Sequence, residues 1–177
     1  MDDVLYFAYG SNLLRERLLP RSPNLAFEGR ALLADHRLTF DKVSTDMSGK
    51  CAFEASAGEV VQGVLWRIPR GDLMALDRHE GVGNGYERCV MPVTREGGEP
   101  AQAVTYRATQ AQRGRQAYDW YLALVIAGAS QQSLPVNYVA GLRDTPFRVD
   151  GETHRKSRLD AIEALSAAGM LGVLLAL

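Results

Sequence analysis

Strand-like segments fill most of the first 108 residues, and helix-like segments fill most of the remainder. The segments rich in branched and aromatic residues, which favour strands, are 4–9, 26–40, 59–68, 86–94 and 101–108. The segments of helical composition are 13–18, 69–80, 116–129, 135–142 and 159–168. Because most strands precede most helices instead of alternating with them, the order favours an α+β domain over a doubly wound βαβ fold. Several short strands with glycine kinks are also compatible with a small barrel.

Turn-forming residues indicate where these strands bend or end. Gly29 predicts a bulge or bend within 26–40. The glycine- and proline-bearing stretch 95–100 predicts a hairpin connection between two strands. The polar stretch 41–58 also carries glycines, and we expect a long loop there around one short strand at 51–55.

Composition and charge are those of an ordinary globular protein. The chain has 177 residues, 46% hydrophobic and 23% charged, and fits a single domain, 1–177. A net charge of −1 creates no overall field toward nucleic acid or an anionic membrane. No apolar run approaches the roughly 20 residues of a membrane span. The basic runs 113–115 and 154–158 have no interleaved aromatics, so we expect solvated surface there and no nucleic-acid site.

The cysteines and the start of the chain indicate a reducing compartment. Cys51 and Cys89 lie far apart and outside any metal-ligand spacing, so we expect buried or free thiols. The acidic start Met1-Asp2-Asp3 is the reverse of the basic region that opens a signal peptide. These features predict a cytoplasmic protein.

One acidic residue lies on the apolar face of the predicted helix at 69–80. On a helical wheel with Leu73 at zero, Leu76 falls at about 300° and Glu80 at about 340°. The carboxylate of Glu80 therefore lies between two leucines, where burial disfavours its charged form and predicts a raised pKa. A carboxyl group with such a pKa is suited to general acid/base catalysis at neutral pH.

The position of Glu80 at a helix end also permits a structural role, in which it swings into water or pairs with an arginine. Gly81, Gly83 and Gly85 form a G-x-G-x-G run that follows a helix and precedes a strand. That order is the reverse of a Rossmann turn, which argues against a dinucleotide site. We expect a helix stop at Gly81 and a pliable loop that allows close approach to Glu80.

The strand at 4–9 ends in Gly10-Ser11-Asn12, which predicts a sharp turn into a helix. Gly10 permits a turn that most residues could not make. The amides of Ser11, Asn12 and Leu13 would then point outward and form an anion or oxyanion site. A plain helix cap by Ser11 or Asn12 is the alternative. A nucleophilic Ser11 is disfavoured, because the G-x-S-x-G motif is absent and none of the three histidines is spaced as its base.

Several motifs occur in the order and spacing of one known family. The run 5–14, LYFAYGSNLL, closely resembles the signature of the γ-glutamylcyclotransferase family, and 76–82, LDRHEGV, resembles its segment with the catalytic glutamate. Further matches are Gly63-Val64-Leu65-Trp66, Gly85-Tyr86, Gly128-Ala129, Leu134-Pro135 and Tyr138. The resemblance covers about residues 4–142. The turn combined with Asp-x-x-Glu-Gly-Val is much more specific than the turn alone.

The resemblance implies a small mixed β-barrel with flanking helices. It also implies an enzyme that cyclises the γ-glutamyl group of a small-molecule substrate to 5-oxoproline, without metal or cofactor, and releases the free amine. Glu80 matches the acid/base of the family. The residues implied to bind substrate are Tyr6, Phe7, Ala8, Tyr9, Gly10, Ser11, Asn12, Tyr86 and Tyr121. Core packing is an alternative role for Tyr86 and for Tyr121.

Three points stay open. The substrate could be a γ-glutamyl amino acid, glutathione or a γ-glutamyl amine such as γ-glutamyl-lysine, and we expect 41–58 and 109–115 to set the choice. A non-catalytic module that binds a small metabolite on the same fold is the alternative function. The tail 143–177 matches the family poorly and ends in an apolar run at 170–177. That run is too short to span a membrane; it could pack on the body or cover a partner subunit in a homodimer.

Overall fold

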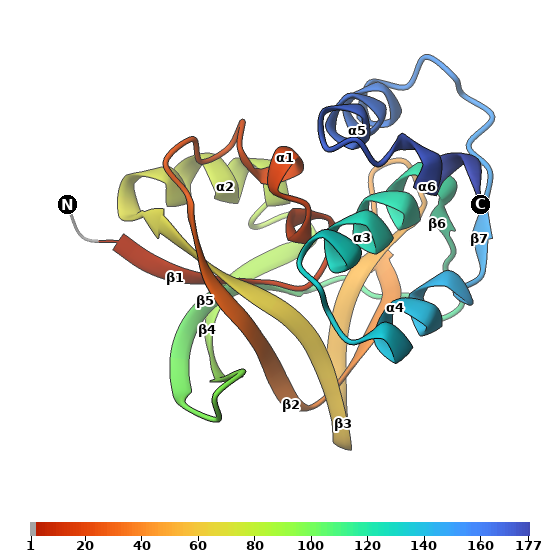
Figure 1. The fold of residues 1–177 in the computed structure, drawn as a ribbon. Helices are drawn as coiled ribbons and strands as arrows, with labels where there is room; N and C mark the ends of the chain where they lie inside the picture. The colour runs from red at the N-terminus through yellow and green to blue at the C-terminus, as the bar shows by residue number, and fades with distance from the viewer. Residues whose placement is uncertain (1–2) are drawn as a thin grey trace.

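The computed structural model describes residues 3–177, and its centre is a closed five-stranded barrel (Figure 1). The strands are β1 (Asp3–Ala8), β2 (Ala26–Val43), β3 (Gly49–Pro69), β4 (Tyr86–Arg95) and β5 (Pro100–Ala108). Their order is β1-β3-β2-β4-β5, and every neighbouring pair is antiparallel except β1 with β5, which closes the barrel in parallel. The predicted α+β mixed barrel is therefore confirmed.

The long hairpin of β2 and β3 shows that the loop predicted at 41–58 is wrong. Strand pairing continues until Val43 lies opposite Gly49, which leaves only a short turn between them. The stretch is polar because much of the hairpin meets solvent, whereas Cys51, Ala52 and Phe53 are buried. The polar residues of these solvent-exposed strand segments are also typical of loops, which is why the sequence pattern predicted one.

Two other strand features agree with their predictions. The register of β2 against β3 shifts between Phe27 and Gly29, where Gly29 has φ of +122°, so the predicted bulge is confirmed. β4 and β5 form the predicted hairpin, with Thr94 opposite Pro100 at its tip.

The helices gather mainly on one side of the barrel (Figure 1). The helical elements are η1 (Ser11–Leu13), α1 (Arg15–Leu18), η2 (Arg70–Asp72), α2 (Leu73–Glu80), α3 (Asp119–Gln131), α4 (Val136–Arg143), α5 (Lys156–Ala167) and α6 (Leu171–Leu175). Helix α3 begins later than predicted, because β6 (Ala117–Tyr118) pairs in parallel with β7 (Phe147–Arg148). Every residue of α3 up to Ala129 is buried, so this helix forms the core beside the barrel.

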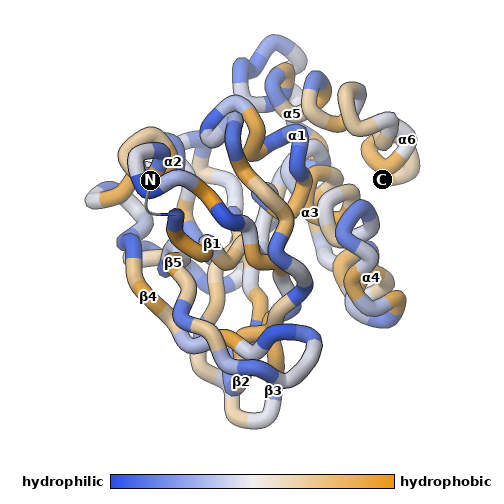
Figure 2. The backbone as a smooth tube through the Cα atoms, turned by 60° about the vertical axis from the view of Figure 1, so that its left-hand side comes forward, coloured by the Kyte–Doolittle hydropathy of each residue, from blue (hydrophilic) through white to orange (hydrophobic). Residues whose placement is uncertain are grey.

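The C-terminal tail packs on the body of the chain. Ala161, Ala164 and Leu165 of α5 are buried in the same core cluster as α3. Helix α6, largely hydrophobic in Figure 2, lays Leu171 and Leu174 against that cluster. Of the two arrangements that the sequence left open, packing on the body is present. Within residues 3–177, no helix is both long enough and apolar enough to cross a bilayer.

Candidate active site

Glu80 is the last residue of α2, and its side chain is largely buried. Leu73 and Leu76 of the same helix are buried in the core, and Gly81 ends the helix in the left-handed conformation with φ of 69°. The side chain of Glu80 is 17% exposed and forms an ion pair of 3.3 Å with Arg21. Glu80 is therefore shielded from solvent although it ends the helix, and the arginine partner considered as the alternative is present.

Asn12 connects the turn after β1 to Glu80. Its Nδ2 donates hydrogen bonds to Oε1 of Glu80 and to the hydroxyl of Tyr6, both at 2.8 Å. Its Oδ1 accepts from Arg21 at 2.7 Å, and its backbone oxygen accepts from Trp66 at 3.1 Å. Each polar group of the Asn12 side chain thus has a partner inside the site.

The short helix after the turn differs from its prediction. Neither Ser11 nor Asn12 caps a helix by a side-chain hydrogen bond. The chain forms the 3₁₀ turn η1, becomes extended at Leu14 with ψ of 117°, and only then begins α1. The cap is absent because the Asn12 side chain is turned into the site, where it meets Tyr6 and Glu80.

Gly10 has a φ of −122°, which other residues also adopt. The position requires glycine because there is no space for a side chain. A Cβ atom at Gly10 would lie 3.0 Å from Cβ of Cys51 and 3.4 Å from the hydroxyl oxygen of Tyr121. The amide of Leu13 donates to the carbonyl oxygen of Gly10 at 2.9 Å, so it does not point outward as predicted. Within residues 3–177, the amides of Ser11 and Asn12 donate to no protein acceptor.

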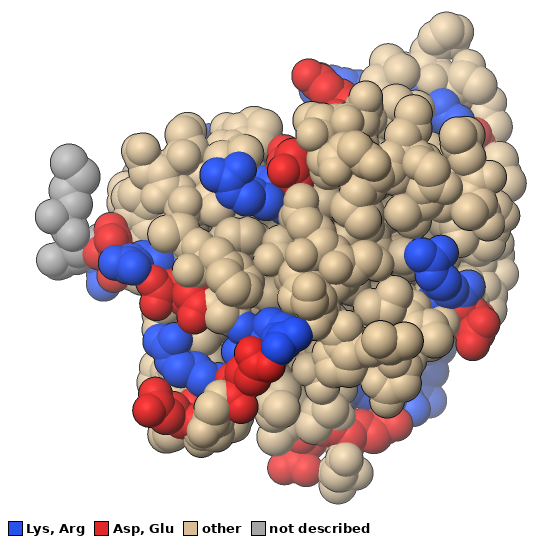
Figure 3. Space-filling view, viewed as in Figure 1, with Lys and Arg blue, Asp and Glu red and all other residues tan. Residues whose placement is uncertain are grey.

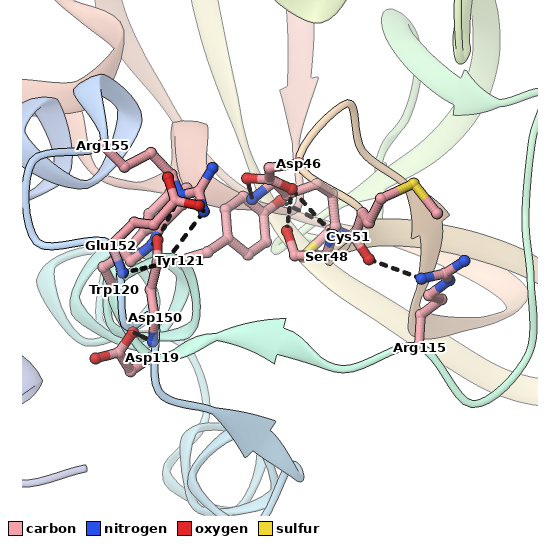
Figure 4. Close-up of polar contacts among 12 residues, drawn as sticks. Asp46, Ser48, Cys51, Arg115, Asp119, Trp120, Tyr121, Asp150, Glu152 and Arg155 are labelled. Atoms are coloured by element: carbon pink, nitrogen blue, oxygen red, sulfur yellow. Dashed lines mark hydrogen bonds and ion pairs between the residues drawn. The ribbon is translucent and has the colours of Figure 1, made fainter.

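A small inner cavity lies between the turn and Glu80. Its lining residues are Tyr6, Tyr9, Gly10, Ser11, Asn12, Cys51, Glu80, Tyr86, Tyr106 and Tyr121. Three of the tyrosines are fixed through backbone groups. Tyr9 donates to the carbonyl oxygen of Tyr106 at 2.6 Å, and Tyr86 donates to that of Cys51 at 2.5 Å. The amide of Cys51 donates to the hydroxyl of Tyr121 at 3.1 Å (Figure 4).

The other ionisable groups of the inner cavity remain protonated at neutral pH. Burial raises the pKa of the hydroxyls of Tyr9, Tyr86 and Tyr121 far above their ordinary value. Burial also raises the pKa of the Cys51 thiol to about 12. The tyrosines can therefore donate and accept hydrogen bonds there, and the carboxylate of Glu80 is left as the candidate base.

The cavity brings together most of the residues that the resemblance implied. Phe7 and Ala8 do not line it. Phe7 faces the opposite side of β1 from Tyr6, because alternate residues of a strand face opposite sides. The ring of Phe7 instead packs against Gly63, where an added Cβ atom would lie only 2.6 Å from a ring carbon. Sequence reasoning missed Tyr106, which only the pairing of β5 beside β1 brings into the site.

An outer cavity of about 450 Å³ adjoins the inner one, which has about 30 Å³. The two share Ser11, Glu80, Tyr86 and Tyr121. The outer cavity also receives side chains of the β2–β3 turn and of helix α5. A small substrate beside Glu80 would therefore extend from the inner cavity into the outer one.

One face of the molecule carries charges of both signs. On the face shown in Figure 3, acidic and basic side chains are interspersed. Two members of the basic run 154–158 form intramolecular ion pairs, Arg155 with Asp150 and Lys156 with Asp160. Among the described residues, no group of three or more His, Cys, Asp or Glu side chains could hold a metal ion.

Fold and site together define a small β-barrel protein with one carboxylate at the mouth of a tyrosine-lined cavity. A model of the AIG2-like family matches residues 60–142. The γ-glutamylcyclotransferase of Bos taurus is 35% identical over 144 residues, which are 77% of this chain and 76% of the relative. The γ-glutamylcyclotransferase of Homo sapiens is 34% identical over 148 residues, which are 80% of this chain and 78% of the relative.

A solved structure described as a γ-glutamyl cyclotransferase has a TM-score of 0.83 at 29% identity, and the match covers 92% of this chain and 99% of that one. The chain belongs to the γ-glutamylcyclotransferase family. The family, the barrel and the enzyme class predicted from the motifs are therefore confirmed.

Proposed function

We propose that this chain cyclises the γ-glutamyl group of a γ-glutamyl amino acid or amine to 5-oxoproline and releases the free amine. The observation that carries this proposal is the Glu80 carboxylate, which borders both cavities and accepts a hydrogen bond from Asn12 of the turn. The two mammalian relatives bear the name of this activity.

The reaction is an intramolecular aminolysis. The α-nitrogen of the γ-glutamyl group attacks its own γ-carbonyl carbon, so that a carbon–nitrogen bond forms and closes the five-membered lactam. Glu80 takes a proton from the attacking nitrogen and returns it to the leaving nitrogen as the original amide bond breaks. Acid/base transfer of this kind typically contributes about 10²–10⁴-fold.

Positioning of the substrate supplies the larger part of the rate. A near-attack pose of amine and carbonyl can contribute roughly 7–11 kcal/mol. The inner cavity suits this task, because three of its five tyrosines are fixed by hydrogen bonds to backbone groups. The amides of Ser11 and Asn12 are the donors available for the substrate carboxylate or for the oxyanion that develops at the γ-carbonyl.

The test is mass spectrometry for 5-oxoproline after incubation with γ-glutamyl-alanine, glutathione and γ-glutamyl-lysine in parallel. We expect product from at least one compound, and its identity assigns the substrate class. The variant Glu80→Gln keeps the shape of the side chain but cannot accept the proton, so we expect a folded protein with turnover reduced about 10²–10⁴-fold.

The matched control is Glu87→Gln, the same substitution at an exposed residue of β4 that pairs with Arg107. Its turnover should equal that of the parent protein. Near-normal turnover of Glu80→Gln would remove Glu80 from its role. Binding without product from all three compounds would favour the non-catalytic module. A cytoplasmic location and a homodimer stay predictions; the two free thiols are consistent with the former.

A further inference from the structure

Two lysines face each other across the β2–β3 hairpin. Lys42 and Lys50 are register partners in the antiparallel pair, next to the turn. Like charges directly opposite in a sheet are destabilising. Both lysines also line the outer cavity beside Glu80. An arrangement that disfavours folding and borders a catalytic cavity calls for a functional explanation.

Burial makes this pair still less favourable. Lys42 is 8% exposed, and the side chain of Lys50 is 13% exposed. Nζ of Lys50 is buried without a hydrogen bond, since its nearest carboxylate oxygen, on Asp46, lies 3.6 Å away. Its other neighbours are the rings of Trp120 and Tyr121, with centroids at 4.2 and 4.4 Å. The ammonium group of Lys50 thus has one carboxylate within ion-pair distance and no hydrogen bond, which leaves its donors free for a ligand.

Lys42 is held over an aromatic ring in a similar way. Its Nζ lies 4.8 Å from the centroid of Tyr86, a residue of the inner cavity. Gly85 makes room for it, because a Cβ at that position would lie 2.9 Å from Cε of Lys42. Among the described residues, no carboxylate lies within ion-pair distance of Lys42.

The outer cavity as a whole has an excess of positive charge. Its six cations are Arg17, Arg21, Lys42, Lys50, Arg155 and Lys156, against the three carboxylates Asp46, Glu80 and Asp160. Four of the cations have a carboxylate partner. Within residues 3–177, Arg17 and Lys42 have none, and Nε of Arg17 is buried without a hydrogen bond. The unneutralised charge is thus concentrated beside Lys50 and Glu80.

We propose that Lys42 and Lys50, with Arg17 behind them, form an anion subsite that binds a carboxylate on the leaving part of the γ-glutamyl substrate. This inference rests on the proposed function. In this proposal the γ-glutamyl group lies beside Glu80 and reaches into the inner cavity, where the lining contains no cation. The leaving part extends past Glu80 into the outer cavity, where the lysines lie. The subsite thereby selects leaving amines with a carboxylate over neutral or cationic amines.

The test compares two substrates that differ in one charge, γ-glutamyl-alanine and γ-glutamyl-alaninamide. The measured quantity is the ratio of their kcat/KM values, with 5-oxoproline as the product followed. Because hydrogen bonds to charged groups are strong, we expect the parent protein to prefer the acid about tenfold or more. Lys50→Met and Lys42→Met each keep an apolar stem and remove the ammonium, so each should bring the ratio near one.

Lys156→Met is the matched control, since Lys156 lines the same cavity but its side chain is 88% exposed and paired with Asp160. Its ratio should stay within about twofold of the parent value. Thermal melting of each variant checks that it is folded. Equal rates for acid and amide in the parent protein would overturn the subsite. An equal loss for both substrates in the lysine variants would also overturn it, because the lysines would then bind the γ-glutamyl group.

Calorimetric titration of both compounds into Glu80→Gln separates the subsite from the proposed function. If the parent protein turns over neither compound, nor glutathione, nor γ-glutamyl-lysine, the proposed function fails. A preference of Glu80→Gln for the acid that disappears in Glu80→Gln/Lys50→Met would still support the subsite. Absence of any binding would overturn both.

Discussion

At the scale of single residues, Lys50 is a buried charged group whose protonated form lowers the stability of the fold. Burial lowers the pKa of Lys50 to about 8 from 10.5. Asp46 opposes this shift, whereas Arg17 and Lys42 add to it. The folded state therefore holds the proton of Lys50 less tightly than the unfolded chain does, so the protonated lysine weakens the fold.

This shift gives a prediction about stability and pH. Between pH 8 and 10.5 the unfolded chain binds more protons at Lys50 than the folded one, so stability from this group rises with pH across that window. Below pH 8 we expect Lys50→Met to be more stable than the parent protein, by at most about 3 kcal/mol. Denaturant unfolding at about pH 7 and about pH 9.5 measures whether the advantage shrinks as the lysine loses its proton. An advantage that grows with pH would contradict the assignment.

Residues of the site were predictable where the signal was local. Glu80 is recognisable because a carboxylate interrupts a run of leucines at helical spacing, and the turn after β1 is recognisable from its motif. Arg21 was not predictable, since it reaches Glu80 from the loop after α1. Tyr106 was missed for a related reason, because an aromatic residue near a strand end gives no indication of its partner strand. Such contacts depend on pairing between distant segments.

At the scale of elements, the turn after β1 is held against helix α3 by a glycine. A Cβ on Gly128 would lie 2.4 Å from the amide nitrogen of Leu14 and 2.6 Å from Cβ of Leu13. Backbone atoms cannot yield as a flexible side chain does, so α3 and η1 fit together only without that atom. This contact sets the distance between the buried helix and the turn that carries Asn12.

Gly128→Ala should therefore push the turn away from α3. Overpacking of this kind typically costs about 1–3 kcal/mol. We expect a lower melting temperature and reduced 5-oxoproline release, because Asn12 would no longer meet Glu80 at 2.8 Å. Gly141→Ala in α4 is the control, since nothing lies within 4 Å of its Cβ position. Activity and melting temperature of Gly128→Ala equal to those of the control would show that the contact is dispensable.

The elements themselves were predictable to different degrees. Most strands and helices lie within a few residues of their predicted ranges, because hydrophobic periodicity and glycine stops are local signals. The hairpin of β2 and β3 was predicted as a loop, since its exposed face is polar and contains glycines. The difference matters for the site, because Lys42 and Lys50 belong to paired strands and not to a loop, and their positions are fixed by the strand register.

At the scale of the whole molecule, barrel closure and the C-terminal tail form the outer cavity together. The order β1-β3-β2-β4-β5 could not be derived from the sequence, because β1 pairs with strands that follow it by some 60 and 100 residues. Helix α5 supplies one wall of the outer cavity, although its sequence resembles the family poorly. Asp150 supports that wall by accepting hydrogen bonds from Trp120 at 2.9 Å and from Arg155 at 2.6 Å (Figure 4).

The small inner cavity lies behind the larger outer one, and this arrangement predicts the order in which the two reaction products are released. Apart from the residues shared with the outer cavity, buried side chains line the inner one. For the proposed reaction, we expect the freed amine, formed in the outer cavity, to leave first and the lactam to follow. An ordered sequence of this kind makes 5-oxoproline a competitive inhibitor and the amine a noncompetitive one. Steady-state product inhibition distinguishes this sequence from random release, in which both products compete with substrate.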